Sequence, residues 1–144
     1  MKLFLDGNIC LDLLDSQRPT SKATIEWYLK YKDCEDFAFY FSSDFITTLF
    51  YILTQKQKVA PKLVIQAIDS LSSETMPVYP KHEDFLHAKE DFQTGLMDDF
   101  EDLFVLNSAN RVACESFVTH DKEILNLSSF KGMMLSSPIS FDIN

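Results

Sequence analysis

Five successive apolar residues, Phe37-Ala38-Phe39-Tyr40-Phe41, form the longest aromatic run of the chain. A strand with one wet face alternates apolar and polar residues, whereas an unbroken run is typical of a strand buried on both faces, as in parallel sheets covered by helices. Further strand candidates alternate with segments of helical spacing: strands at 2–5, 75–79, 117–119 and 133–135, and helices at 8–14, 22–32, 44–56, 61–71, 82–93, 100–113 and 122–127. This order predicts an α/β protein, a three-layer α/β/α sandwich with a central parallel sheet of four to five strands.

The length of 144 residues suits one domain, and no linker or repeat divides it, so we expect a single domain over 1–144. Cys10, Cys34 and Cys114 lack the spacing of a disulfide framework or a zinc site, which favours a reducing cytoplasm. The N-terminus does not resemble a signal peptide, and no apolar stretch approaches the ~20 residues of a membrane span. We therefore expect a cytoplasmic protein without a membrane segment.

The formal net charge is −9. This acidity argues against broad, non-specific binding of nucleic acid, which depends on Lys and Arg neutralising phosphates. It does not exclude an enzyme acting on nucleic acid, because a cluster of carboxylates contributes to the count and bound divalent cations offset it locally. The same charge would suit a basic protein partner.

Acidic residues stand where strands give way to helices. Asp6 follows the run 3–5, Asp121 follows 116–119, and Asp102 belongs to the acidic stretch 98–102 that opens a helix. In open α/β folds the carboxyl edge of the sheet is where ligands bind, so these side chains predict one pocket. Oxygen ligands of this kind suit Mg²⁺ or Mn²⁺. Each acid also has a local alternative as a helix cap or a first-turn partner of the helix dipole.

Three motifs in this order resemble the PIN-domain nucleases, a family that includes the toxins of many bacterial toxin–antitoxin pairs. They are Phe4-Leu5-Asp6-Gly7-Asn8, then Asp99-Phe100-Glu101-Asp102-Leu103 followed by Ala109, and Phe117-Val118-Thr119-His120-Asp121. The resemblance covers nearly the whole chain and agrees with the predicted strand and helix positions.

The resemblance implies that Asp6, Asp102 and Asp121 are catalytic carboxylates that bind the metal. It implies that Asn8 supports Asp6 by hydrogen bonding and that Thr119 lies near the pocket. The implied activity is hydrolysis of RNA phosphodiester bonds by a water activated by Mg²⁺ or Mn²⁺. The implied partners are an RNA substrate, an antitoxin protein whose segment covers the acidic pocket, and a second copy of the chain in a homodimer.

Two positions depart from the family pattern. Gly7 stands where the family usually has a hydroxyl residue, and Thr48 stands where its second motif has an acid. Asp44 lies four residues before Thr48, hence on the same helical face, and is a further metal candidate, as is Asp99 on the pocket rim. The departures leave an alternative open, a degenerate PIN-like domain without catalysis that acts as an RNA-binding or protein-interaction module.

Other residues have ordinary explanations. We expect Asp12 to be a solvated surface charge and His120 to be an exposed loop histidine. The aromatic residues of 45–53 have helical spacing, and we expect them in the core or a dimer interface rather than in a base-stacking surface. Receiver domains and haloacid-dehalogenase-type phosphatases also place acids at strand ends. A receiver domain would need a second acid beside the one after the first strand and a lysine after the last strand, and this chain has neither in the right place. A haloacid-dehalogenase-type phosphatase would need an Asp at position 8, where this chain has Asn8.

Overall fold

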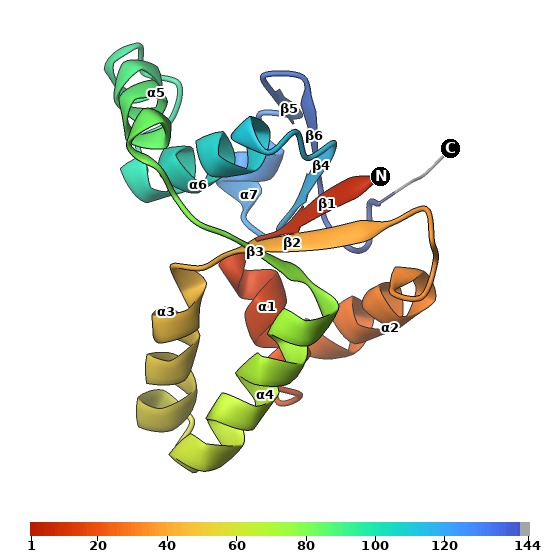
Figure 1. The fold of residues 1–144 in the computed structure, drawn as a ribbon. Helices are drawn as coiled ribbons and strands as arrows, with labels where there is room; N and C mark the ends of the chain where they lie inside the picture. Colours follow the sequence, from red (N-terminus) through yellow and green to blue (C-terminus); the bar gives the residue numbers. More distant parts are fainter. Residues whose placement is uncertain (142–144) are drawn as a thin grey trace.

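The computed structural model describes residues 1–141, which form a twisted sheet with helices on both faces (Figure 1). The strands are β1 (Lys2–Leu5), β2 (Ala38–Ser42), β3 (Met76–Val78), β4 (Ser116–Val118), β5 (Ser129–Phe130) and β6 (Met133–Ser136). Their order in the sheet is β3-β2-β1-β4-β6-β5, with β1 between β2 and β4. The pairs joining β1, β2, β3, β4 and β6 are all parallel. The predicted fold class is confirmed.

The central strands are buried on both faces, as their unbroken apolar runs predict. Successive side chains of a strand point to opposite faces. Leu3 and Leu5 accordingly pack with Phe39 in one core, while Phe4 belongs to the other, where its ring stacks on Phe117 with a centroid distance of 5.3 Å. Two hydrophobic cores therefore pack against the two faces of the sheet and fix the positions of its strand ends.

Two groups of helices cover the two faces (Figure 1). One group is α1 (Gly7–Leu14), α2 (Ser21–Tyr31), α3 (Phe45–Tyr51) with the π-helical turn η1 (Ile52–Lys56), and α4 (Pro61–Glu74). The other is α5 (His82–Gln93), α6 (Phe100–Arg111) and α7 (Lys122–Leu125). The helix expected at 44–56 is thus α3 continued by a π-helical turn. None of the described helices combines the length and apolar character needed to cross a bilayer.

Among the described residues, the five parallel strands agree with the expected parallel sheet of four to five strands, and a sixth strand, β5, is added antiparallel to β6. The β5–β6 connection is the two-residue turn Lys131-Gly132, with φ of 49° and 86°. Positive φ at both positions is the geometry of a type I′ hairpin turn. A strand of two residues carries no apolar run or alternation, so the sequence pattern gives no signal for β5.

The sheet has a topological switch point between β1 and β4. The chain goes from β1 to β2 and β3 on one side, and the later strands β4 and β6 lie on the other. Ligand sites of open α/β sheets lie outside the carboxyl ends of the strands at such a point. Asp6 follows β1 and the segment 119–121 follows β4, so both are at this location.

Candidate active site

Asp6 is the N-cap of α1 and is only 9% exposed. Its Oδ1 accepts a hydrogen bond from the Gly7 backbone N–H at 2.8 Å, and its Oδ2 accepts one from the Thr119 hydroxyl at 2.7 Å. Burial raises the pKa of Asp6, these two hydrogen bonds lower it in part, and the negative charges of Asp121 and Glu101 raise it again. The carboxylate therefore lies in a site that is already rich in negative charge.

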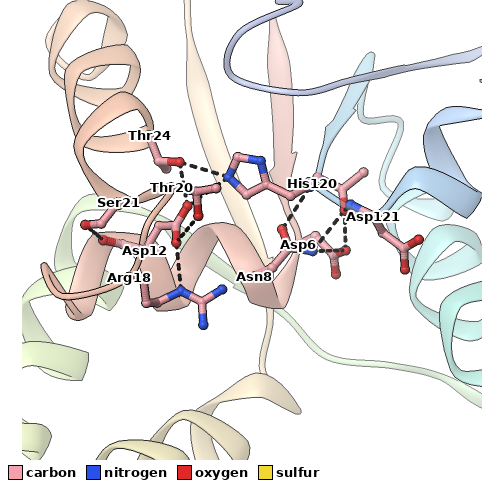
Figure 2. A network of polar contacts seen from close by, with 10 residues as sticks. Asp6, Asn8, Asp12, Arg18, Thr20, Ser21, Thr24, His120 and Asp121 are labelled. Atoms are coloured by element: carbon pink, nitrogen blue, oxygen red, sulfur yellow. Dashed lines mark hydrogen bonds and ion pairs between the residues drawn. The ribbon is translucent and has the colours of Figure 1, made fainter. Parts of the chain in front are cut away.

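Asn8 and Thr119 connect the ends of β1 and β4. The Asn8 amide donates to the Thr119 hydroxyl at 3.1 Å and to Asp6 Oδ2 at 3.4 Å, and its Oδ1 accepts from the His120 backbone N–H at 3.0 Å (Figure 2). The fully buried Thr119 hydroxyl also accepts from the Asp121 backbone N–H at 3.0 Å. It thus uses its one donor and two acceptor positions. This network fixes the relative positions of Asp6 and Asp121.

Asp121 and Asp99 both cap helices. Asp121 Oδ1 accepts from the Glu123 backbone N–H at 2.9 Å at the start of α7. Asp99 is exposed, and its Oδ1 accepts from the backbone N–H groups of Glu101 and Asp102 at 2.9 and 3.2 Å at the start of α6. The alternative role as a helix cap is therefore observed for both Asp99 and Asp121. A cap uses one oxygen of each carboxylate and leaves the other available.

Asp102 differs from the other acids because its Oδ2 is buried and makes no hydrogen bond within the described residues. Burial raises the pKa of Asp102 to about 7, and the negative charges of Asp99, Asp6 and Asp121 add to the rise. Asp6, Asp102 and Asp121 are therefore near one another although they come from three separate parts of the chain. A buried carboxylate oxygen without a partner is costly unless a cation or proton compensates it.

Asp44 and Thr48 lie on α3 at the other side of this region. Both are exposed, and together with Glu101 of α6 they line one cavity of about 280 Å³. The Asp44 side chain makes no capping bond to α3, although it stands at the N-cap position. The helical spacing that places Asp44 and Thr48 on one face is thus observed. Glu101, which the sequence suggested was a first-turn acid, also faces this cavity.

Next to the acidic residues lies a second polar network around Asp12, which is fully buried (Figure 2). Its carboxylate accepts hydrogen bonds from Arg18 Nε at 2.7 Å and from the hydroxyls of Thr20 and Thr24 at 2.8 and 2.6 Å. Burial alone would raise the pKa of Asp12, but the hydrogen bonds from Thr24, Arg18, Thr20 and His120 outweigh it and lower the pKa below its usual value. The expectation that Asp12 is a solvated surface charge is wrong.

The expectation for His120 is also wrong, because its ring is tied to this network. Nε2 of His120 lies 2.8 Å from Asp12 Oδ2 and 3.0 Å from the Thr24 hydroxyl. The side chain is 19% exposed. His120 therefore anchors the segment carrying Thr119 and Asp121 to α1 and α2. Arg18, Thr20 and Thr24 follow Asp12 within 12 residues, but their contacts with its carboxylate become evident only in the folded chain.

The acidic residues have the chemistry that a hard divalent cation prefers, because their free groups are carboxylate oxygens. Among residues 1–141, no three His, Cys, Asp or Glu side chains are close enough to enclose an ion by themselves. Mg²⁺ needs only one or two carboxylates, however, and keeps several waters. The unpartnered Oδ2 of Asp102 and the raised pKa values of Asp6 and Asp102 are the features that a cation would relieve. The donor set therefore fits a hard divalent cation.

The model of the PIN domain matches residues 2–123 of the chain. The chain therefore belongs to the PIN-domain family, and the resemblance found in its three motifs is confirmed. No curated protein sequence is significantly similar to it.

Solved structures of bacterial toxin–antitoxin proteins share the fold. VapBC2 from Rickettsia felis, bound to a DNA fragment from its promoter, matches with a TM-score of 0.67 and 17% identity over 99% of this chain and 100% of that chain. VapC20 from Mycobacterium tuberculosis, a Sarcin-Ricin loop cleaving toxin, matches with a TM-score of 0.69 and 11% identity, over 92% of this chain and 98% of that chain. DNA-bound VapBC from Salmonella typhimurium matches with a TM-score of 0.69 and 15% identity, over 96% of this chain and 98% of that chain. At these identities the likeness establishes the fold.

Proposed function

We propose that the protein is a metal-dependent endoribonuclease that hydrolyses RNA phosphodiester bonds, and that it is the toxin of a toxin–antitoxin pair. The observation that carries the proposal is the buried, unpartnered Oδ2 of Asp102, close to Asp6 and Asp121 at the switch point of the sheet. Membership in the PIN family and the VapC-like fold support the choice of an RNA-cleaving activity.

In this proposal Asp6, Asp102 and Asp121 hold Mg²⁺ or Mn²⁺. The bound cation supplies the Lewis acidity that activates water and stabilises charge on the phosphate. Asn8 and Thr119 keep Asp6 oriented by the hydrogen bonds described above, and no side chain acts as a nucleophile. Asp44 and Asp99 are further candidates: the Asp44 side chain makes no capping bond to α3 within the described residues, and Asp99 is the acid whose charge acts most strongly on Asp102. Thr48 contributes a hydroxyl where an acid would bind more strongly.

The proposal includes a protein partner and a homodimer. VapBC proteins of the same fold were solved as complexes with DNA, and an acidic pocket attracts a basic segment of an antitoxin. Exposed apolar side chains on one group of helices offer surface for a partner or a second copy, for example Leu63 and Ile65 of α4 at 58% and 59% exposure. Three free cysteines fit a reducing cytoplasm.

Calorimetric titration of the purified protein with Mn²⁺ tests the metal site without relying on activity. We expect one site for wild type, a loss of at least tenfold in affinity for Asp6→Asn and Asp102→Asn, and no change for the matched control Asp69→Asn on α4, far along the chain from the three motifs. Equal affinity in all four proteins would contradict the assignment of the ligands.

Two observations favour a second candidate function. Thr48 replaces the acid of the second motif, and the described residues do not enclose an ion on their own. A degenerate PIN-like domain that binds RNA or a protein without cleaving it would have both features. Absence of Mn²⁺ binding in the titration, from protein that is folded and free of a partner, would support this alternative.

A further inference from the structure

A cavity of about 280 Å³ opens between α3 and α6, beside the acidic residues. Three partly exposed aromatic rings form walls of it, Phe45 from α3 and Phe100 and Phe104 from α6. Small-molecule sites span roughly 300–1,000 Å³, so this volume corresponds to one small group rather than to a large ligand. The sequence predicts Phe45 in the core or a dimer interface; the ring does pack against both hydrophobic cores, and its remaining exposed part lines this cavity.

The cavity is contiguous with the proposed catalytic site. A Cβ built on Gly7, the residue after Asp6, would meet the Phe45 ring at 3.7 Å, so the ring packs over the turn that follows β1. Glu101 lines the cavity and is sequence neighbour of Asp102. If the proposed cation at Asp6 and Asp102 held a phosphate of the RNA, the base of an adjoining nucleotide would lie beside the three rings.

The polar groups of the cavity select among bases. Its charged residues are Asp44 and Glu101, and its lining contains no Lys, Arg or His. Ser42 and Thr48 add hydroxyls, which can both donate and accept and therefore do not discriminate among the bases. A carboxylate only accepts hydrogen bonds. Cytosine and adenine present exocyclic amino donors, whereas uracil presents a carbonyl oxygen at the corresponding edge, which a carboxylate repels. Aromatic rings bind any base by stacking, so the carboxylates supply the discrimination.

We propose that this cavity binds an unstacked cytosine or adenine base, taken from the RNA strand at the acidic site. The choice of RNA as the source of the base rests on the proposed function. The acidic protein has few cations with which to hold a phosphate backbone, so a stacked and hydrogen-bonded base gives the RNA a second point of attachment beside the metal.

The test uses neutral nucleosides, which need neither a metal nor a phosphate contact. Cytidine, adenosine and uridine are titrated into the full chain in the presence of chelator, and binding is followed by NMR chemical shifts. We expect cytidine and adenosine to bind at least about fivefold more tightly than uridine. Phe104→Ala should weaken the binding of cytidine and adenosine by about 5- to 100-fold, which is the range expected for the loss of one stacking contact.

Matched variants separate stacking, hydrogen bonding and folding. Phe104→Leu keeps apolar volume and should weaken binding less than Phe104→Ala, while Glu101→Gln should reduce the preference over uridine. Tyr79→Ala, an exposed aromatic outside the cavity, should change nothing. The melting temperature of each variant identifies any loss of binding that comes from unfolding, and Phe104→Leu is the variant that decides if Phe104→Ala unfolds.

Equal binding of the three nucleosides, or an unchanged affinity in folded Phe104 variants, would overturn the proposal. Binding of arginine amide that depends on Phe104, without preference among nucleosides, would overturn it in favour of a basic protein segment. If the nucleosides are discriminated but the protein never cleaves RNA, the base site stands and the proposed nuclease function falls.

Discussion

At the scale of single residues, Asp102 has the least favourable environment among the acids of the site. Burial and the charges of Asp99, Asp6 and Asp121 raise its pKa to about 7, and one of its oxygens has no hydrogen-bond partner among residues 1–141. Such a residue makes the metal-free protein less stable, and in the proposed function a cation bound to it would restore that stability. On this account the proposed metal site lowers the stability of the metal-free protein.

The first prediction concerns the metal-free stability of Asp102→Asn. The pKa of Asp102 is about 7 in the folded protein, against about 3.9 in an unfolded chain, so the unfolded state gives up this proton first. Wild-type stability from this group therefore falls as pH rises from about 4 to about 7. We expect Asp102→Asn to melt a few degrees above wild type at pH 8 in chelator, and the gain to shrink toward pH 5.

Thermal unfolding by calorimetry in chelator at the two pH values checks this, with Glu115→Gln on the surface as control. A variant that is less stable than wild type at both pH values would show that the Asp102 carboxylate stabilises the fold instead.

Asp12 represents the opposite case, a buried carboxylate whose hydrogen bonds are complete. Asp12→Asn removes the charge that holds Arg18, Thr20, Thr24 and His120 together, and we expect it to lower the free energy of unfolding by about 3 kcal/mol at pH 7. The pKa of Asp12 is lowered by folding, so its stabilisation is present above about pH 4 and is lost as pH falls through the folded pKa.

Urea unfolding at pH 7 and pH 3.5 measures the effect of Asp12→Asn. Asp15→Asn, a helix-end residue that accepts a single backbone hydrogen bond, should change stability by less than about 1 kcal/mol. A similar small change for Asp12→Asn would mean that the network contributes little to the fold.

At the scale of elements, the site depends on how α3 and α6 face each other. Helix α6 brings Asp102 and Glu101 to the site, while α3 offers Asp44 and Thr48 across the cavity. In the proposed metal site, the hydroxyl of Thr48 on α3 stands on the wall where the family resemblance implies an acid. Thr48 is exposed, so a longer side chain at this position has room.

Restoring the acid with Thr48→Glu should strengthen Mn²⁺ binding by about tenfold, because a carboxylate is a far better ligand for a hard cation than a hydroxyl. The same side chain would enter the aromatic cavity, so cytidine binding should weaken. Thr48→Gln, of similar size without the charge, serves as the control for the titration with Mn²⁺. Unchanged Mn²⁺ affinity in Thr48→Glu would indicate that position 48 does not face the cation.

The sequence predicts the elements that have strong patterns and misses those that lack one. The aromatic run 37–41 and the acids that follow β1 and β4 predict the parallel sheet and its functional edge. Strand β5 is not predicted, because two residues are too few to show a hydrophobic periodicity. The Asp12–His120 pair escapes because the two residues are 108 positions apart, and only the folded chain shows that they meet. Burial of a charge is a tertiary property that local spacing does not reveal.

At the scale of the whole molecule, the two groups of helices differ in their free surface. We expect the homodimer to use the group that includes α4, so Leu63→Glu combined with Ile65→Glu should give a monomer with little change in melting temperature, because both side chains are more than half exposed. Light scattering after gel filtration measures the mass over a range of concentrations. Leu86→Glu on α5 tests the opposite face. If the double variant stays dimeric and Leu86→Glu is monomeric, the interface lies on the face that carries α5.

The measurement that tests the central claim is cleavage of total RNA by the purified, partner-free protein, with Mn²⁺, with Mg²⁺ and with chelator. Asp6→Asn is run beside the wild type, since it keeps the size of the side chain and removes the charge. The account predicts cleavage that requires the metal and disappears in Asp6→Asn. Folded protein that binds RNA but cleaves none in either metal, or cleavage that persists in Asp6→Asn, would contradict it.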